Sequence, residues 1–422
     1  MVTEAAGPPG LWRHRDFLLL WTGQTISVFG SQFTGIALPL IAALTLRADP
    51  LQFGLLNAVG TAPFLLFGLF VGVWVDRMAR RPILIAGDLG RGVIVVSIAL
   101  LAFAGSLRIE HLYAAAFLTG VLTVFFDVAY QSYLPSLIDR KQLVDANSRL
   151  ETTRAASQVA GPGIGGLIVQ LFSAGLAMVI DALTFFVSVA FLLAIRKPED
   201  VPKPSGRQSM AADVREGLGT VFGEPRLRAI AGCTATSNLF FSAIGAVYVL
   251  FVIDDLGFRS TAGAVLGTVF GLGSLGALAG AVAAGKLAKR FGVGRMIVAG
   301  SVLFGLGALP LAAAPPGPIA IPLLVVSNLI VLFGALVYNV NQVSLRQAIT
   351  PNRLQGRMNA TMRFLVWGTI PLGAIMGGLL GSVIGIRATI WIAFLGASSA
   401  VLWVLFSPVR SLQRIPEPAA DG

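Results

Sequence analysis

Long apolar runs separated by short polar turns occupy almost the whole chain. A helix needs ~20 apolar residues to cross the hydrocarbon core of a bilayer. We identify twelve candidate spans, at residues 17–46, 52–75, 83–104, 111–134, 146–171, 176–195, 228–253, 262–285, 296–314, 319–345, 358–384 and 386–407. These runs are too long for the strands of a membrane barrel. The pattern therefore predicts an all-α membrane protein with twelve transmembrane helices.

The composition supports a membrane location, and the placement of charge predicts the orientation. Hydrophobic residues make up 55% of the chain and charged residues 12%, whereas about 25% of residues are charged in a soluble domain. The net charge is +11, but only four of the 31 basic residues fall on one side of the predicted spans, namely Arg47, Arg108, Arg259 and Arg387. The positive-inside rule then places both termini in the cytoplasm. We expect a multi-pass protein of the cell (inner) membrane, without a nucleic-acid partner.

Few residues suit metal or cofactor chemistry. His14 and His111 lie far apart and Cys233 is the only cysteine, so we expect no metal site and no disulfide within the chain. The sequence GLGSLG at 271–276 has dinucleotide-binding spacing, but it lies inside an apolar run without a preceding strand. A near-match to a phosphate loop at 280–287 lacks the required hydroxyl residue. No cleavable signal peptide is expected either, because the first apolar run has the length of a full span. We therefore expect neither an enzyme nor a bound cofactor.

The two halves of the chain carry related patterns. A shift of 212 residues aligns Gly161 with Gly373. A shift of 213 aligns Arg77 with Arg290. Such matches predict two six-helix bundles in parallel repeat, related by an axis along the membrane normal. The predicted organisation is a cytoplasmic N-terminus at 1–16, an N-terminal bundle at 17–195, a cytoplasmic linker at 196–227 with a short amphipathic helix on the inner membrane face, a C-terminal bundle at 228–407 and a cytoplasmic tail at 408–422.

A basic loop, GVWVDRMARR at residues 72–81, separates the second and third apolar runs. It fits the pattern G-x-x-x-D-R-x-x-R-R at Gly72, Asp76, Arg77, Arg80 and Arg81. With twelve spans in two halves, the chain resembles the major facilitator superfamily over essentially its whole length. The resemblance implies that the loop takes part in a conformational switch, with Asp76 facing the N-terminus of the eleventh span, where a carboxylate gains from the helix dipole. The alternative is that these charges only enforce topology.

The fifth run contains GPGIGG at residues 161–166. It matches the pattern G-P-x-x-G-G of the same superfamily at Gly161, Pro162, Gly165 and Gly166, and the resemblance associates this pattern with exporters and antiporters. Because proline removes a helix hydrogen bond and glycine lets a neighbouring helix approach closely, we predict a bend at a contact between the halves. Ordinary packing of small residues is the alternative. A smooth packing face is also predicted in the eleventh span, at Gly373, Gly377, Gly381 and Gly385.

Acidic residues within a span cost at least ~2.5 kcal/mol on insertion scales. Asp127, in the cytoplasmic half of the fourth span, is predicted to complete the charge network of the loop with Arg80 and Arg154, or else to carry a proton. Asp181 opens DALTF in the sixth span, a stretch similar to one in the multidrug and macrolide efflux branch of the superfamily. It is expected either to cap the helix or to couple transport to protons.

Asp88 and Arg91 lie three residues apart near the inner end of the third span. This spacing places both side chains on one face of a helix. They are predicted to form a structural ion pair.

A transport cavity is expected on the first, fourth, seventh and tenth spans, which the resemblance implies are central. Polar and aromatic side chains on these spans are the candidates for its lining, although each can instead bond a neighbouring helix. They are Gln24, Ser27, Ser31 and Thr34, Phe125, Phe126 and Tyr130, Asn238, Ser242 and Tyr248, and Asn328, Tyr338, Asn341 and Gln342. The scarcity of charge favours a bulky, neutral or amphipathic ligand.

The sequence thus predicts a secondary transporter that exports hydrophobic or amphipathic small molecules by alternating access, driven by a proton gradient. Its expected partners are the lipid bilayer and a small-molecule substrate, and a monomer is expected. A dedicated siderophore exporter and an uptake carrier remain open as alternatives. A membrane sensor that transports nothing is the alternative of another class.

Overall fold

The computed structural model describes residues 11–68, 70–75, 77–139, 142–199 and 210–414, and this part is helical without strands. The first half comprises α1 (Arg15–Leu40), α2 (Pro50–Phe67), α3 (Val71–Val75), α4 (Arg80–Phe103), α5 (Ile109–Leu137), α6 (Leu143–Leu171) and α7 (Ala174–Ala194). The linker holds α8 (Met210–Gly223). The second half comprises α9 (Pro225–Leu250), α10 (Ala262–Phe291), α11 (Val293–Leu306), α12 (Leu309–Ala312), α13 (Ala320–Ile349), α14 (Asn352–Trp367), α15 (Thr369–Ile384), α16 (Ile386–Ser399) and α17 (Val401–Leu405). The predicted all-α membrane fold is confirmed.

Eleven helical segments in the described part are long and apolar enough to cross a membrane. The remaining predicted span is α6, whose N-terminal end carries Asp145, Arg149 and Glu151 and whose C-terminal half is rich in glycine. It nevertheless packs lengthwise between α1 and α10. Neighbouring protein therefore compensates for its low hydropathy.

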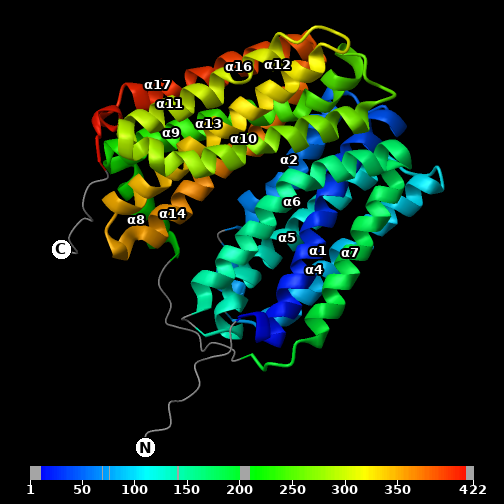
Figure 1. Cartoon of the computed structure of the whole chain (residues 1–422), viewed down its shortest axis with the longest axis horizontal. Helices are drawn as coiled ribbons and strands as arrows, with labels where there is room; N and C mark the ends of the chain where they lie inside the picture. Colours follow the sequence, from blue (N-terminus) through cyan, green and yellow to red (C-terminus); the bar gives the residue numbers. More distant parts are fainter. Residues whose placement is uncertain (1–10, 69, 76, 140–141, 200–209, 415–422) are drawn as a thin grey trace, which may run out of the picture.

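Figure 1 shows two bundles, the first half in blue to green and the second in green to red. They meet where α6 packs on α10 and α2 packs on α15, and they diverge toward α8 and α14. The repeat extends to fine detail, because α1 and α9 both end in a single π-helical turn, at Ile41–Thr45 and Phe251–Asp255. The linker helix packs on α14 of the second bundle.

Two predicted spans are interrupted near the predicted inner side. The second ends as α2 at Phe67, and the short α3 follows. The eleventh is divided at Gly368 into α14 and α15, and a Cβ at Gly368 would lie 3.1 Å from Cδ1 of Leu65 in α2. A glycine at this point allows the two halves to touch while the helix changes direction.

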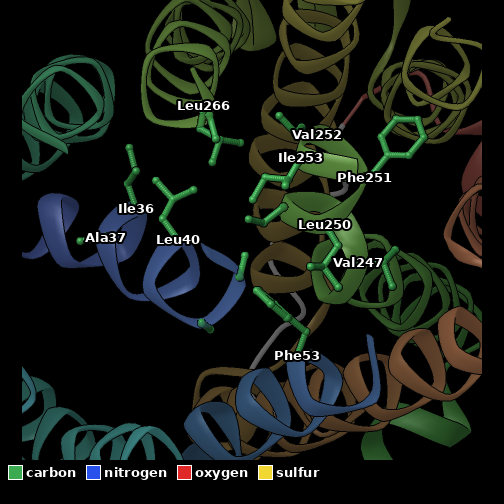
Figure 2. Packing of buried hydrophobic residues seen from close by; sticks show 14 of the residues in the cluster. Ile36, Ala37, Leu40, Phe53, Val247, Leu250, Phe251, Val252, Ile253 and Leu266 are labelled. Atoms are coloured by element: carbon green, nitrogen blue, oxygen red, sulfur yellow. The ribbon is translucent and has the colours of Figure 1, made fainter. Parts of the chain in front are cut away.

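The distribution of the buried core indicates which side of the molecule is closed. One cluster of buried apolar residues joins both halves at the end where they meet. Figure 2 shows part of it, with side chains of α1, α2, α9 and α10 packed together, among them Ile36, Leu40, Phe53, Val247, Leu250 and Leu266. At the opposite end the halves have separate cores, one drawn only from residues 11–195 and the other only from residues 221–412. The shared core closes the molecule at the end where the halves meet.

Candidate functional site

Rows of small residues line both contacts between the halves. In one, a Cβ at Gly166 of α6 would lie 2.6 Å from Cα of Gly267 in α10, and Ser274 of α10 donates to the carbonyl of Gln158 in α6 at 2.9 Å. In the other, a Cβ at Gly54 of α2 would lie 2.8 Å from Cα of Gly378 in α15. Such spacing excludes any side chain, so the two helix pairs touch backbone to backbone.

The sequence GPGIGG contributes to two contacts at once. Pro162 lies inside α6, and Gly161 and Gly165 face Gln32 and Phe33 of α1 within the first half. Gly166 faces α10 of the second half. Gly373, Gly377 and Gly381 pack against neighbouring helices as predicted. Gly385 does not belong to this packing face, because it ends α15 with a φ of 89° and lies in a turn.

A cavity of about 290 Å³ lies between the halves, just inside the shared core. Asn57 of α2, Tyr248 of α9 and Asn328 of α13 supply polar groups to its wall. Phe53, Phe241 and Phe270 supply aromatic surface, and the rings of Tyr248 and Phe270 lie 5.5 Å apart. A largely apolar wall with a few polar groups is typical of a small-molecule site.

Two of the predicted cavity residues, Tyr248 and Asn328, line this cavity, whereas Asn57 was missed. Asn57 is a polar residue within an apolar span and could have been selected on that ground. It was passed over because the second span was not among the helices expected to be central.

The other predicted cavity residues engage neighbouring helices or their own helix. Asn238 donates to the carbonyl of Val366 at 3.1 Å, and Ser242 donates to that of Ile370 at 2.7 Å. Thr34 lines a separate cavity within the first half. The others line none of the three cavities, and their contacts are Gln24 with Ser188, Ser27 in the buried core, Ser31 with the carbonyl of Ser27, Phe125 with Trp74, Phe126 with Tyr130, Tyr338 with Thr234, Asn341 with the carbonyl of Val337 and Gln342 with Asn339. Their role in ligand binding stays a prediction.

The first half encloses an ion pair. The predicted pair of Asp88 and Arg91 is confirmed, with Nη2 of Arg91 2.5 Å from Oδ1 of Asp88. The guanidinium lies over the rings of Phe126 and Phe185, at 4.2 and 4.8 Å from their centroids. Because Asp88 is fully buried, its charge depends on this one arginine.

Asp181 is also buried, in α7 against α1. The hydroxyl of Thr184 lies 3.4 Å from its Oδ1, and a Cβ at Gly30 of α1 would lie 2.8 Å from the same oxygen. The cap of α7 is Ser173, whose hydroxyl accepts from the amide of Leu176 at 3.1 Å. Asp181 therefore does not cap the helix, which leaves its proposed role in proton coupling.

The predicted ion pairs of Asp127 with Arg80 and Arg154 are absent from the described part of this conformation. Arg80 instead pairs with Glu199 at 3.3 Å, and Arg154 pairs with Glu151 at 3.9 Å. The acid nearest to Arg80 is on the linker and the acid nearest to Arg154 is on its own helix. The positions of the spans in the sequence could not reveal these nearer partners.

Glu199 binds the basic loop at residues 72–81, and the sequence did not predict this contact. Its carboxylate accepts from the backbone amides of Arg80 at 2.8 Å and Arg81 at 3.0 Å, at the N-terminus of α4. Arg81 donates in turn to the carbonyls of Leu192 and Leu193 at 2.9 Å. These contacts anchor the loop to the end of α7. Asp76 lies outside the described residues. Within the described part, a Cβ at Gly72 would meet nothing within 4 Å and Arg77 forms no ion pair, so their role in gating stays a prediction.

The linker helix α8 is bound to the second half by a second acid. Glu216 pairs with Arg353 at 3.4 Å and also contacts Arg357, both on α14. Gly217 lies against the carbonyl of Arg357, which a Cβ would approach to 2.8 Å. The predicted short helix is therefore present and packs on α14. Its position on the inner membrane face stays a prediction.

No group of three potential metal ligands comes together among the residues that the structure describes. The site therefore offers cavities, small-residue contacts and buried charges rather than a catalytic constellation. Its arrangement suits the binding and movement of a ligand between two rigid halves.

Comparison with known proteins agrees with this arrangement. The family described as transmembrane secretion effector matches residues 7–420. The multidrug efflux pump Tap of Mycolicibacterium fortuitum is 26% identical over 381 residues, covering 88% of this chain and 90% of the pump. Macrolide efflux protein A of Streptococcus pyogenes is 23% identical over 184 residues, covering 43% of this chain and 45% of that protein.

Among solved structures, the nucleoside transporter NupG superposes with a TM-score of 0.72 at 13% identity, covering 92% of this chain and 97% of the transporter. This similarity concerns the fold alone. The family match spans nearly the whole chain and agrees with the two-bundle architecture. The chain therefore belongs to the transmembrane secretion effector family of the major facilitator superfamily, and it is a multi-pass membrane transporter rather than an enzyme.

Proposed function

We propose that this protein exports hydrophobic or amphipathic small molecules, including drugs and antibiotics, across the cell membrane by alternating access. The observation that carries the proposal is the distribution of the core. One shared apolar cluster closes the outer ends, the inner ends have separate cores, and an aromatic cavity lies between the halves. Two relatives are named as multidrug and macrolide efflux pumps, which supports this choice of substrate.

The orientation follows from the positive-inside bias of the sequence. With both termini in the cytoplasm, the closed end faces outward and the structure is an inward-facing conformation. A substrate would then enter the cavity from the cytoplasm or the inner leaflet. Rocking of the halves about the cavity would expose it to the other side.

A susceptibility and accumulation panel tests the export function. A strain that overexpresses the protein should accumulate less of at least one hydrophobic drug and tolerate more of it than a deletion strain. Unchanged accumulation of every compound, with the protein verified in the membrane, would contradict the proposal. Export of an iron-chelating metabolite and of no tested drug would instead support a dedicated siderophore exporter. A higher accumulation of a compound in the overexpressing strain would support uptake.

Proton antiport is proposed as the energy source, with Asp127 and Asp181 as the candidate carriers. Asparagine keeps the shape of each side chain but cannot ionise, so the variant that loses the carrier should lose transport driven by a pH gradient. Drug uptake into proteoliposomes under an imposed pH gradient measures this. Full gradient-driven transport by both Asp127→Asn and Asp181→Asn would eliminate these two candidates.

Tyr248 is expected to contribute to ligand binding through its ring. Its replacement by alanine removes an aromatic face from the cavity wall, and an aromatic pair contributes about 0.5–1.5 kcal/mol beyond burial of area. The apparent affinity for an aromatic drug should therefore fall by about 3-fold to 10-fold in Tyr248→Ala. Equilibrium binding to purified protein measures the change. The control Tyr248→Phe keeps the ring and should bind nearly as the native protein does, and equal binding by all three would exclude the role.

A further inference from the structure

A second cavity, of about 250 Å³, lies within the first half of the protein. Five helices, α1, α2, α4, α5 and α7, contribute to its wall. Apolar side chains cover most of this wall, among them Leu38, Ile94 and Met178. Apolar cavities of about 150 Å³ already exclude water and bind apolar molecules. The second cavity therefore suits an apolar group.

The second cavity adjoins the cavity between the halves. On α1, Gly35 lines the cavity between the halves, and its neighbour Thr34 lines the second. On α2, Asn57 lines the cavity between the halves, and Gly60, one turn later on the same face, lines the second. In the described part, α1 packs on α6 and α7 and α2 packs on α5 and α15, but α1 and α2 do not pack on each other along their length. A ligand between the halves can therefore reach the second cavity between α1 and α2.

Gly60 keeps this route wide because it has no side chain. A Cβ at Gly60 would meet only the Cβ of Ala116 in α5, at 3.6 Å, which is ordinary contact. Behind this point α2 and α5 touch, since a Cβ at Gly120 would lie 2.6 Å from the carbonyl oxygen of Gly60. Phe64 bounds the second cavity further along α2 and also lines a third one, of about 100 Å³, whose wall includes Asp127. A larger residue at position 60 would thus fill the second cavity without displacing backbone.

Thr34 supplies a polar group to the second cavity. Its hydroxyl oxygen is buried and has no hydrogen-bond partner in the described part of the chain, although the carboxylate of Asp181 lies near it. Thr25 and Ser31 of the same helix instead donate to carbonyls four residues earlier. A buried hydroxyl without a partner is destabilising, so a ligand that bonds it gains affinity.

The cavity between the halves holds about 290 Å³, the lower end of the range of about 300–1,000 Å³ for ligand pockets. We propose that the second cavity is a side pocket of the substrate site and takes an apolar arm of the ligand. The aromatic part of the ligand occupies the cavity between the halves, and Thr34 bonds an oxygen atom where the arm begins. The inference rests on the export function proposed above, and it narrows the substrates to amphipathic molecules with an aromatic ring and an apolar arm. A lipid acyl chain suits the pocket less, because its hydrocarbon offers no partner to Thr34.

A series of n-alkyl esters of para-aminobenzoic acid, from ethyl to octyl, tests the side pocket. Equilibrium binding to purified protein should tighten as the arm lengthens, by up to about fourfold for each methylene that becomes buried. Gly60→Leu fills the pocket from α2 and Ala116→Leu fills it from α5. Each variant should bind the octyl ester more weakly than the native protein does, by about tenfold or more, and bind the ethyl ester as before. Comparing one ester between proteins cancels its partition into detergent.

Three further variants separate the parts of the site. The matched control is Gly285→Leu on α10, where a Cβ would meet nothing within 4 Å and no cavity is lined, and it should bind every ester as the native protein does. Tyr248→Ala should weaken all esters by the same factor, because its ring lies in the other cavity. Thr34→Val keeps the shape of the side chain and should weaken the esters by about 2-fold to 10-fold. It should leave n-alkyl anilines, which lack the ester oxygens, unchanged.

The outcomes also separate this inference from the function on which it rests. If native affinity is independent of arm length while the ethyl ester binds through Tyr248, only the side pocket fails, and a lipid chain that already fills it would give this result. Equal loss of ethyl and octyl binding in Gly60→Leu and Ala116→Leu would also overturn the pocket, as would drugs that bind when no ester does. Unchanged ester binding by Thr34→Val would remove the role of the hydroxyl. If the native protein binds neither esters nor drugs, the proposed export function fails together with the pocket.

Discussion

Replacement of Arg91 by alanine is expected to destabilise the first half of the protein by about 3–5 kcal/mol, the cost of removing one partner from a buried ion pair. Asp88 is fully buried, and its Oδ2 has no partner in the described part of the chain, so Arg91 is its main compensation. The arginine also fills the space between the rings of Phe126 and Phe185. Alanine would leave both a lone charge and a cavity.

Thermal unfolding of the detergent-solubilised protein measures this effect, and the apparent melting temperature of Arg91→Ala should fall markedly. The double variant Asp88→Leu with Arg91→Met removes both charges and keeps apolar volume, so it should recover most of the lost stability. Native-like melting of Arg91→Ala would show that water already reaches Asp88. A double variant no more stable than Arg91→Ala would indicate that the ring contacts, rather than the charge, carry the stability.

The spans, the repeat and the fold class could be predicted because they depend on the amount of apolar sequence. The segment 146–171 was predicted as a span and forms most of α6, although its polar inner end excludes it from the apolar candidates. Internal breaks were missed. The division at Gly368 lies beside Leu65 of the other half, a contact that no local pattern encodes.

The direction of polar side chains was harder to predict than their presence. Asn238 and Asn57 both lie in apolar helices, yet Asn238 bonds a carbonyl of the next helix and Asn57 lines the cavity between the halves. A helix surrounded by protein and lipid is apolar on every face, so periodicity does not distinguish these environments. The partners of Arg80 and Arg357 are acids of the linker, and such pairings depend on the path of the chain after α7.

The close contact between α6 and α10 predicts a second large effect, on the balance between conformations. A Cβ at Gly166 would lie 2.6 Å from Cα of Gly267 and would also contact the carbonyl of Gly263. Both neighbours are backbone, which cannot move aside without separating the helices. Overpacking of this kind costs typically 1–3 kcal/mol. Alternating access, as proposed above, separates the halves at their outer ends and would break this contact. Gly166→Ala should therefore favour the outward-facing state.

If the added methyl group destabilises the inward-facing conformation by about 2 kcal/mol, the ratio of inward-facing to outward-facing protein should fall about thirtyfold. Transport falls with it, because the cytoplasmic entrance is then rarely open. The matched control is Gly163→Ala, the same change three residues away, where a Cβ would meet nothing closer than the carbonyl of Gly267 at 3.9 Å. Labelling of a cysteine introduced on the outer half of α10 measures opening, and drug export measures function. Equal labelling in the two variants would mean that α6 and α10 separate little during the cycle, which would contradict the expected shift.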